Sequence, residues 1–365
     1  MGNRNQGEEM EIKQFNFLDE DKRLERLSKL GDPLEKLTAA VNFEMFRPLL
    51  TAIFRKVKIA GEKNKGGRPP WDAVLIFKVL ILQELYGIGD DNTEYLINDR
   101  LSFQRFLGLT LGSKVPDSKS MWAYKDALSK SGRGKELFDM FGAKLDEIGI
   151  ITRKGSLIDA SFADAPRQRN SREENATIKS GEIPEEWKKP DKKSKHKLAQ
   201  KDTDARWTKK GNETHYGYKD HVKVDQESKI ITNFVITDAS VHDSQTIVEL
   251  IDKDDEAAYA DSAYVGEDLH KEILEKNPDI KLKICEKGSR GNPLTQEQKD
   301  SNREKSRVRS RVEHVFGHMT VSMGDIVVRT IGIEKATLTL TLKNLAYNIS
   351  RFAFLSRKDH LAVIS

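Results

Sequence analysis

At Gly155-Ser-Leu-Ile-Asp159 the helical spacing of apolar residues changes to a short apolar run that predicts a strand ending on a carboxylate. Ala257-Ala-Tyr-Ala-Asp261 repeats this arrangement about a hundred residues later. Parallel strands of an open α/β sheet present functional groups at one edge, where ligands bind. Asp159 and Asp261 are therefore candidate site residues. The alternative is that each simply forms a turn.

The sequence around these two strands predicts a mixed sheet. Two strand-like runs, 215–225 and 230–237, are joined by a hairpin-like segment at 226–229. Helices are expected at 243–252 and 267–276, a last strand at 280–284, and a long helix at 297–319. The fold class is therefore α/β over residues 151–325.

Helices are expected on both sides of this α/β part. Apolar spacing predicts helical segments within 1–150, a helical N-terminal region, and again within 326–365, where Thr-Leu alternation keeps a strand possible at 337–342. The segments expected at the N-terminal side are 16–60, 71–86, 92–98, 102–107, 118–128 and 132–149. Short helices with tight turns suit a DNA-reading helix-turn-helix and equally a small helical bundle. A basic, Gly/Pro-rich breaker at 61–70 contains Arg68.

Residues 165–214 interrupt the α/β pattern. They hold three prolines, few aliphatic residues, and 14 Lys/Arg against 9 Asp/Glu. A long interval without clear periodicity inside a compact domain indicates an insertion or a disordered loop. We expect this basic insertion to be mobile in the absence of DNA.

Composition narrows the class of protein. The chain has 365 residues, a formal net charge of +4 and 33% charged residues, against a usual ~25%. No run approaches the ~18 uncharged apolar residues of a membrane span, and no secretory signal is visible, so a cytoplasmic protein is expected. A single cysteine, Cys285, excludes a disulfide framework and a cysteine-rich zinc site. Local basic tracts at 167–214 and 283–311 suit phosphate contacts or a solvated surface.

Glu313 is the third candidate carboxylate. It borders the apolar stripe of the helix expected at 297–319, with Arg309 one turn earlier. The alternative is a surface Arg–Glu pair. Two strand-end aspartates and a helical glutamate form an oxygen-only set, which suits Mg²⁺. His314 and His318 are spaced to hold zinc on one helix face, but the further residues of a zinc hydrolase are not at the expected places.

Five blocks of this sequence, taken in order, carry a family resemblance. They are Gly155-Ser-Leu-Ile-Asp159-Ala-Ser, His215-Tyr-Gly-Tyr-Lys-Asp-His-Val, Thr237-Asp-Ala-Ser-Val-His-Asp243, Tyr259-Ala-Asp261-Ser-Ala-Tyr and Arg309-Ser-Arg-Val-Glu313-His-Val-Phe. Together they resemble the DDE transposases of bacterial insertion sequences, in particular the family named after insertion sequence five. The segment 66–109 is similar to the N-terminal domain of that family.

The resemblance implies a fold, a reaction and partners. The fold would be an RNase H-like catalytic domain with a mixed sheet, between an all-helical DNA-binding region and a C-terminal helix. Asp159, Asp261 and Glu313 would be the catalytic metal ligands, binding Mg²⁺ with Mn²⁺ as a substitute. Double-stranded DNA, both element ends and target, would be bound by a homodimer or larger synaptic assembly, associated with the nucleoid. The DNA-contacting residues would include Arg309, Arg307, Arg311 and Arg68.

The chain departs from the wider superfamily at two positions beside Glu313. Tyr seven residues before the glutamate and Lys seven residues after it are replaced by Ser306 and Thr320. Arg307 or Arg311 could substitute for their contacts with the terminal strand. Two rival functions remain open: a non-transposing nuclease of the same fold, and a transposase-derived DNA-binding repressor that has lost catalysis.

Overall fold

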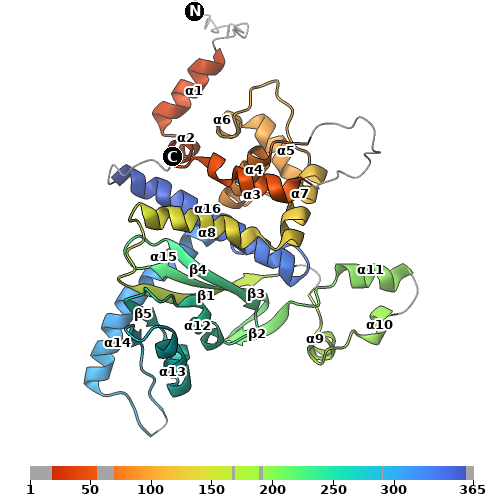
Figure 1. Cartoon of the computed structure of the whole chain (residues 1–365). Helices are drawn as coiled ribbons and strands as arrows, with labels where there is room; N and C mark the ends of the chain where they lie inside the picture. Colours follow the sequence, from red (N-terminus) through yellow and green to blue (C-terminus); the bar gives the residue numbers. More distant parts are fainter. Residues whose placement is uncertain (1–18, 56–69, 167–168, 189–191, 290, 359–365) are drawn as a thin grey trace, which may run out of the picture.

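The computed structural model describes residues 19–55, 70–166, 169–188, 192–289 and 291–358. Figure 1 shows a group of N-terminal helices above two long helices, α8 and α16, with the sheet on the other side of this pair. Arg68, one of the predicted DNA contacts, lies outside the described residues.

The N-terminal helices begin and end where local signals predict. Asp72 caps α4 by accepting hydrogen bonds from the backbone N–H groups of Val74 and Leu75, and Gly87 ends the helix in the left-handed conformation. The expected helical region is thereby confirmed over the described residues. Its elements are α1 (Asp19–Leu30), α2 (Pro33–Ala40), η1 (Phe43–Phe46), α3 (Arg47–Phe54), α4 (Ala73–Tyr86), α5 (Asp90–Asp99), α6 (Leu101–Leu107), α7 (Ser118–Ser131) and α8 (Gly134–Glu147).

The sheet contains the strands that the sequence predicts, together with one inside the insertion. They are β1 (Ser156–Asp164), β2 (Arg206–Lys210), β3 (Glu213–Asp225), β4 (Ile231–Asp238), β5 (Ala257–Ala260) and β6 (Lys281–Ile284). The central order is β4-β3-β1-β5-β6, with β2 paired to the first part of β3. β1, β3 and β4 are antiparallel neighbours, whereas β5 and β6 run parallel to β1. This order and these directions confirm the predicted RNase H-like fold.

The sheet has a separate apolar core on each face. Because side chains alternate along a strand, Leu157 and Ile158 point to opposite faces. Leu157 belongs to a core that also includes the N-terminal helices and α16, while Ile158 packs with residues of α12 and α13. The first core is continuous across residue 150, because Phe138 of α8 packs edge-on against Phe234 of β4.

The remaining helices follow the prediction with two differences. The helix expected at 243–252 is reduced to η2 (Asp243–Gln245) and α12 (Ile247–Leu250). The helix expected at 297–319 is divided into α14 (Gln296–Arg309), η4 (Ser310–Val312) and α15 (Glu313–Ser322). The other elements are η3 (Ser262–Tyr264), α13 (Glu267–Lys276) and α16 (Ile333–Lys358), so residues 337–342 are helical rather than a strand.

The insertion is more ordered than the sequence predicts. Its described residues form α9 (Arg172–Lys179), α10 (Glu185–Lys188) and α11 (Lys192–Gln200) as well as β2. Trp187 is 1% exposed and donates a hydrogen bond from Nε1 to Glu174 Oε1 at 3.1 Å. One buried tryptophan thus ties α10 to the capped helix α9, so the alternative of a disordered loop is wrong for these residues. Whether the insertion moves stays a prediction.

Within the described residues, no helix combines the length and the apolar character needed to cross a membrane.

Candidate active site

Asp159 lies near the start of β1, opposite Val222 of β3. The expectation that the strand ends at Asp159 is wrong, because β1 stays paired with β3 as far as Asp164. Its side chain is 17% exposed. Oδ1 accepts a hydrogen bond from the backbone N–H of Ala160 at 2.9 Å, and Oδ2 accepts one from Arg309 Nη1 at 2.7 Å. Both carboxylate oxygens therefore have a donor from the chain itself.

Asp261 follows β5, the parallel neighbour of β1. Its Oδ1 accepts a hydrogen bond from the backbone N–H of Ala263 at 2.8 Å, which caps η3. Burial raises the pKa of Asp159, and the nearby charge of Asp261 acts in the same direction, whereas the Ala160 hydrogen bond, Arg309 and Lys210 oppose it. The two aspartates are thus close enough to interact electrostatically, as adjacent strand ends predict.

Glu313, the third predicted carboxylate, is exposed to solvent. It is the first residue of α15, directly after η4, and η4 contacts β1. Among the described residues, no three His, Cys, Asp or Glu side chains are arranged to hold a metal ion. The structure therefore brings Asp159 and Asp261 together but does not join Glu313 to them in one cluster.

Arg309 has a different partner from the one expected on a continuous helix. A 3₁₀ turn has three residues per turn, so across η4 residues four apart no longer lie above one another. Arg309 bonds to Asp159 instead of Glu313. Its buried Nε has no hydrogen-bond partner among the described residues.

Comparison with known proteins supplies the family. A family model described as Transposase DDE domain matches residues 152–349, more than half of the chain. The chain belongs to the DDE transposase family. A second model, described as Transposase domain (DUF772), matches residues 22–127 of the transposase. A solved piggyBac transposase synaptic complex with hairpin DNA is 11% identical with a TM-score of 0.48, covering 91% of this chain and 77% of that chain.

The transposase also has a buried polar cluster beside the carboxylates that the sequence did not predict as a unit. Lys219 of β3 donates hydrogen bonds from Nζ to Asp243 Oδ1 at 2.8 Å and to Val241 O at 2.7 Å. His221 Nδ1 lies 3.8 Å from the same Asp243 oxygen, and burial lowers the pKa of His221 to about 4. Asp243 is the first residue of η2, and the ring of His242 caps this turn by accepting a hydrogen bond from the backbone N–H of Ser244.

Tyr264 connects this cluster to the two strand-end aspartates. Its side chain is 1% exposed, and its hydroxyl has no hydrogen-bond partner among the described residues. Burial raises its pKa, and the charges of Asp243, Asp159 and Asp261 add to this effect. Three carboxylates therefore act on one buried phenol that stays protonated. The pairing of Lys219 with Asp243 has no local sequence signal, because the partners are separated by strand β4.

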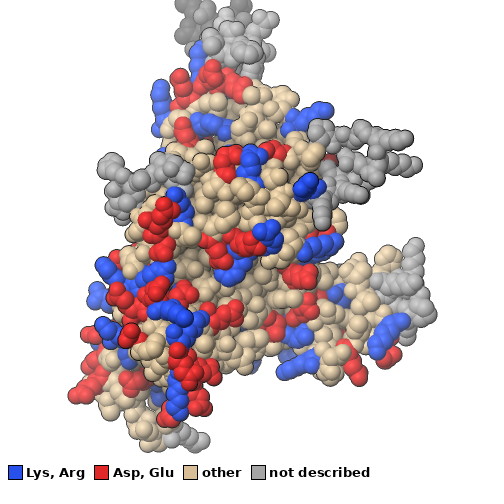
Figure 2. Space-filling view, in the orientation of Figure 1, with Lys and Arg blue, Asp and Glu red and all other residues tan. Residues whose placement is uncertain are grey.

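The other predicted residues are placed as follows. Arg307 and Arg311 are exposed, as are His314 and His318 of α15. Ser306 Oγ lies 3.6 Å from Cys285 Sγ, and Thr320 Oγ1 donates to the backbone of its own helix at Phe316 O. Ser306 and Thr320 therefore make local contacts rather than contacts with the predicted carboxylates. On the face shown in Figure 2, basic and acidic side chains are intermingled.

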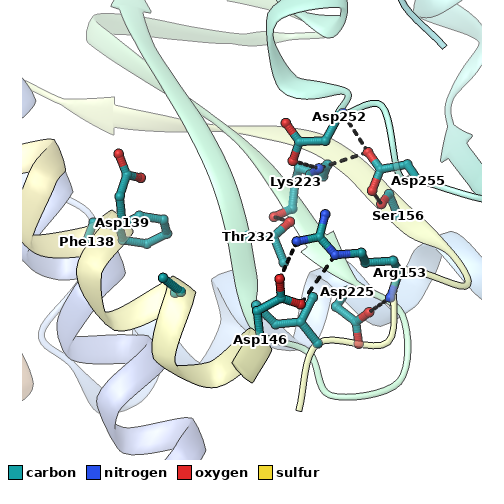
Figure 3. A pocket seen from close by; sticks show the side chains of 13 residues that line it. Phe138, Asp139, Asp146, Arg153, Ser156, Lys223, Asp225, Thr232, Asp252 and Asp255 are labelled. Atoms are coloured by element: carbon teal, nitrogen blue, oxygen red, sulfur yellow. Dashed lines mark hydrogen bonds and ion pairs between the residues drawn. The ribbon is translucent and has the colours of Figure 1, made fainter. Parts of the chain in front are cut away.

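A pocket of about 230 Å³ lies elsewhere on the transposase and contains none of the predicted site residues. Figure 3 shows that its charged side chains bond to one another. Lys223 Nζ donates to Asp255 Oδ2 at 2.8 Å and to Asp252, and Arg153 bonds to Asp146. Because buried Lys223 is already neutralised by Asp252 and Asp255, we interpret these charges as stabilising the fold rather than binding a ligand.

Proposed function

We propose that this transposase binds the inverted repeats at the ends of an insertion sequence and performs Mg²⁺-dependent DNA cleavage and strand transfer. Asp159, Asp261 and Glu313 would be its metal-binding carboxylates. The observation that carries the proposal is that Asp159 of β1 and Asp261, which follows β5, come from adjacent parallel strands, with the charge of one acting on the other.

The donor set fits a hard divalent cation. Asp159 and Asp261 supply only carboxylate oxygens, which Mg²⁺ and Mn²⁺ accept while the rest of the shell comes from water and phosphate. Glu313, exposed at the start of α15, would complete the ligands. Divalent cations held here would activate the attacking oxygen and stabilise charge on the leaving oxygen of an in-line displacement.

Arg309 has two tasks in this proposal. In the structure it neutralises Asp159, with Nη1 2.7 Å from Oδ2. Because a guanidinium binds carboxylate and phosphate alike, Arg309 would orient the carboxylate side of the site and contact the phosphate at the scissile bond. Arg307, Arg311 and Arg68 would bind flanking phosphates.

The remaining parts of the proposal follow from the family. The region 1–150 would recognise the element ends, 151–325 would be catalytic with the insertion 165–214, and 326–365 would close the core. Two ends must be cut together, so a homodimer or larger synaptic assembly is expected. Within the DDE transposases, the chain would fall in the insertion sequence five group, which its sequence blocks resemble. A cytoplasmic, nucleoid-associated protein would meet this DNA.

The test uses the full chain and a duplex that carries the terminal repeat flanking its own gene. With Mg²⁺ or Mn²⁺ we expect strand breaks at the repeat end and joined products with target DNA, and with EDTA neither. Breaks without joined products would support a nuclease instead. Repeat-specific binding without breaks in either metal would support a repressor. A duplex with a scrambled repeat is the control, and equal cutting of both duplexes would contradict end recognition.

A further inference from the structure

The turn between β3 and β4 is held against α16 by hydrogen bonds, and basic side chains lie at this contact. Arg351 Nε donates to Ser228 O at 2.7 Å, and the Tyr347 hydroxyl donates to Lys229 O at 2.9 Å. Lys229 itself has a φ of 61°, a conformation that non-glycine residues adopt only under constraint. These two bonds hold the backbone of the turn against α16 and bring the Arg351 side chain to the turn that carries Lys229.

Arg311 joins this pair from a third element. Arg309, which precedes η4, forms an ion pair with Asp159. Arg311, within η4, is close enough to Lys229 for its positive charge to affect that lysine. Burial and then the like charges of Arg351 and Arg311 lower the pKa of Lys229. The three cations, termed here the basic cluster, therefore come from β3–β4, η4 and α16 and lie within electrostatic reach of one another.

The side chains of the basic cluster have no carboxylate partners among the described residues, unlike a lysine that pairs with the same turn. Over the part of the chain that the structure describes, none of Lys229, Arg311 or Arg351 forms an ion pair with a carboxylate. By contrast, Lys154 pairs with Glu227 of the same turn. Mutual repulsion of unneutralised cations opposes folding, so an external anion would stabilise this arrangement.

We propose that Lys229, Arg311 and Arg351 bind backbone phosphates of the DNA duplex that enters the carboxylate edge. The inference rests on the proposed function and names a phosphate-binding site that includes Lys229 and Arg351. Arg311 belongs to η4, which contacts β1, the strand that carries Asp159, so a duplex bound at the carboxylates would extend toward the basic cluster. Because phosphates are common to all sequences, this contact adds affinity without sequence preference.

The experiment measures DNA affinity of the full chain against salt concentration. The variant Lys229→Gln/Arg311→Gln removes two cations and spares Arg351, whose Nε supports the turn. The matched control, Lys253→Gln/Lys281→Gln, removes two exposed lysines elsewhere and changes the net charge equally. Duplexes with the terminal repeat and with a scrambled repeat are compared, and circular dichroism checks folding.

For the cluster variant we expect affinity to fall at least ~10-fold on both duplexes, and the salt dependence to lose about two phosphate contacts. The control and the charge-conserving Lys229→Arg/Arg311→Lys are expected to bind like the wild type. An unchanged salt slope in a folded cluster variant, or an equal loss in the control, would overturn the inference. If the wild type cuts repeat DNA while the cluster variant binds normally, this inference and the phosphate contact proposed for Arg311 fail, while the proposed reaction stands. If the wild type binds neither duplex, the proposed function fails with it.

Discussion

Arg309 Nη1 donates a hydrogen bond to Asp159 Oδ2 at 2.7 Å, and this contact joins residues separated by 150 positions in the sequence. The side chains are 21% and 17% exposed, so the pair is largely shielded from solvent. The end of α14 is thereby tied to β1 at the position where the first predicted metal ligand lies. The predicted active site is consequently held by a charge pair between its two halves.

Replacing Arg309 by Gln is expected to lower the cleavage rate about 10²-fold, because a positioned charge next to the reacting phosphate is lost. It should also lower the free energy of unfolding by about 1–3 kcal/mol, since Asp159 then lacks its charged partner. Asp159→Asn/Arg309→Gln should be more stable than the sum of the single losses predicts. Arg307→Gln, which changes an exposed neighbour, is the control for the unfolding measurement. Additive losses in denaturant unfolding would contradict the pairing.

Lys219→Met is expected to lower the free energy of unfolding by about 1–3 kcal/mol, because Asp243 loses its short-range cation inside the fold. Asp243→Asn should also destabilise, and the double variant should lose less than the two single losses together. Urea unfolding of the four proteins measures this coupling. No coupling would mean that the 2.8 Å contact contributes nothing. Asp243 is therefore unsuitable as a silent control for the active-site variants.

Asp220 predicts a pH dependence of stability. Burial raises the pKa of this fully buried carboxyl to about 7, while Asn344 Nδ2 donates to its Oδ1 at 3.2 Å. Its other oxygen and Asn344 Oδ1 both lack partners among the described residues, so a protonated Asp220 could complete the pair. The folded pKa lies above the unfolded one, so this contribution is complete below about pH 4 and is lost as pH rises to 7.

For the Asp220 prediction, the free energy of unfolding of the wild type should fall between pH 5 and pH 8 by about 3 kcal/mol more than that of Asp220→Asn. The asparagine amide remains neutral and can donate to Asn344, so it mimics the protonated acid. Parallel pH profiles for the two proteins would show that Asp220 does not titrate in this range.

Trp187→Ala is expected to open the insertion without unfolding the transposase. The tryptophan is buried and bonds to Glu174, so it ties α10 to α9. Trypsin should then cut between residues 165 and 214 faster than in the wild type, while the main thermal transition changes little. Bound DNA should slow this cutting in the wild type. A large loss of global stability would mean that the insertion is part of the main core.

Much of the fold could be predicted from the sequence because its signals are local. The strands that carry or precede Asp159 and Asp261 begin as short apolar runs, and α13 begins and ends where its pattern does, although β1 continues past Asp159 to Asp164. The break at η4 was missed because the apolar stripe of the expected helix, which includes Val308, Val312 and Val315, runs through it.

The missed features of the site depend on contacts between distant segments. Lys219 contacts Asp243 only because β3 and η2 pack together in the fold. Arg309 bonds to Asp159, not to Glu313, because α14 packs against β1. The regular structure within 165–214 is held by one buried tryptophan, and a single apolar residue produces no periodic pattern in the sequence. Neither periodicity nor composition records such pairings.

Cleavage of repeat DNA by three charge-removing variants tests the central claim most directly. Asp159→Asn, Asp261→Asn and Glu313→Gln should each lose more than ~10³-fold in Mg²⁺-dependent cleavage while binding repeat DNA like the wild type, because they act as one unit. Glu304→Gln, an exposed glutamate on α14, should retain activity. Substantial Mg²⁺-dependent cleavage by Glu313→Gln, with loss of activity in Glu304→Gln, would contradict the assignment of the third ligand.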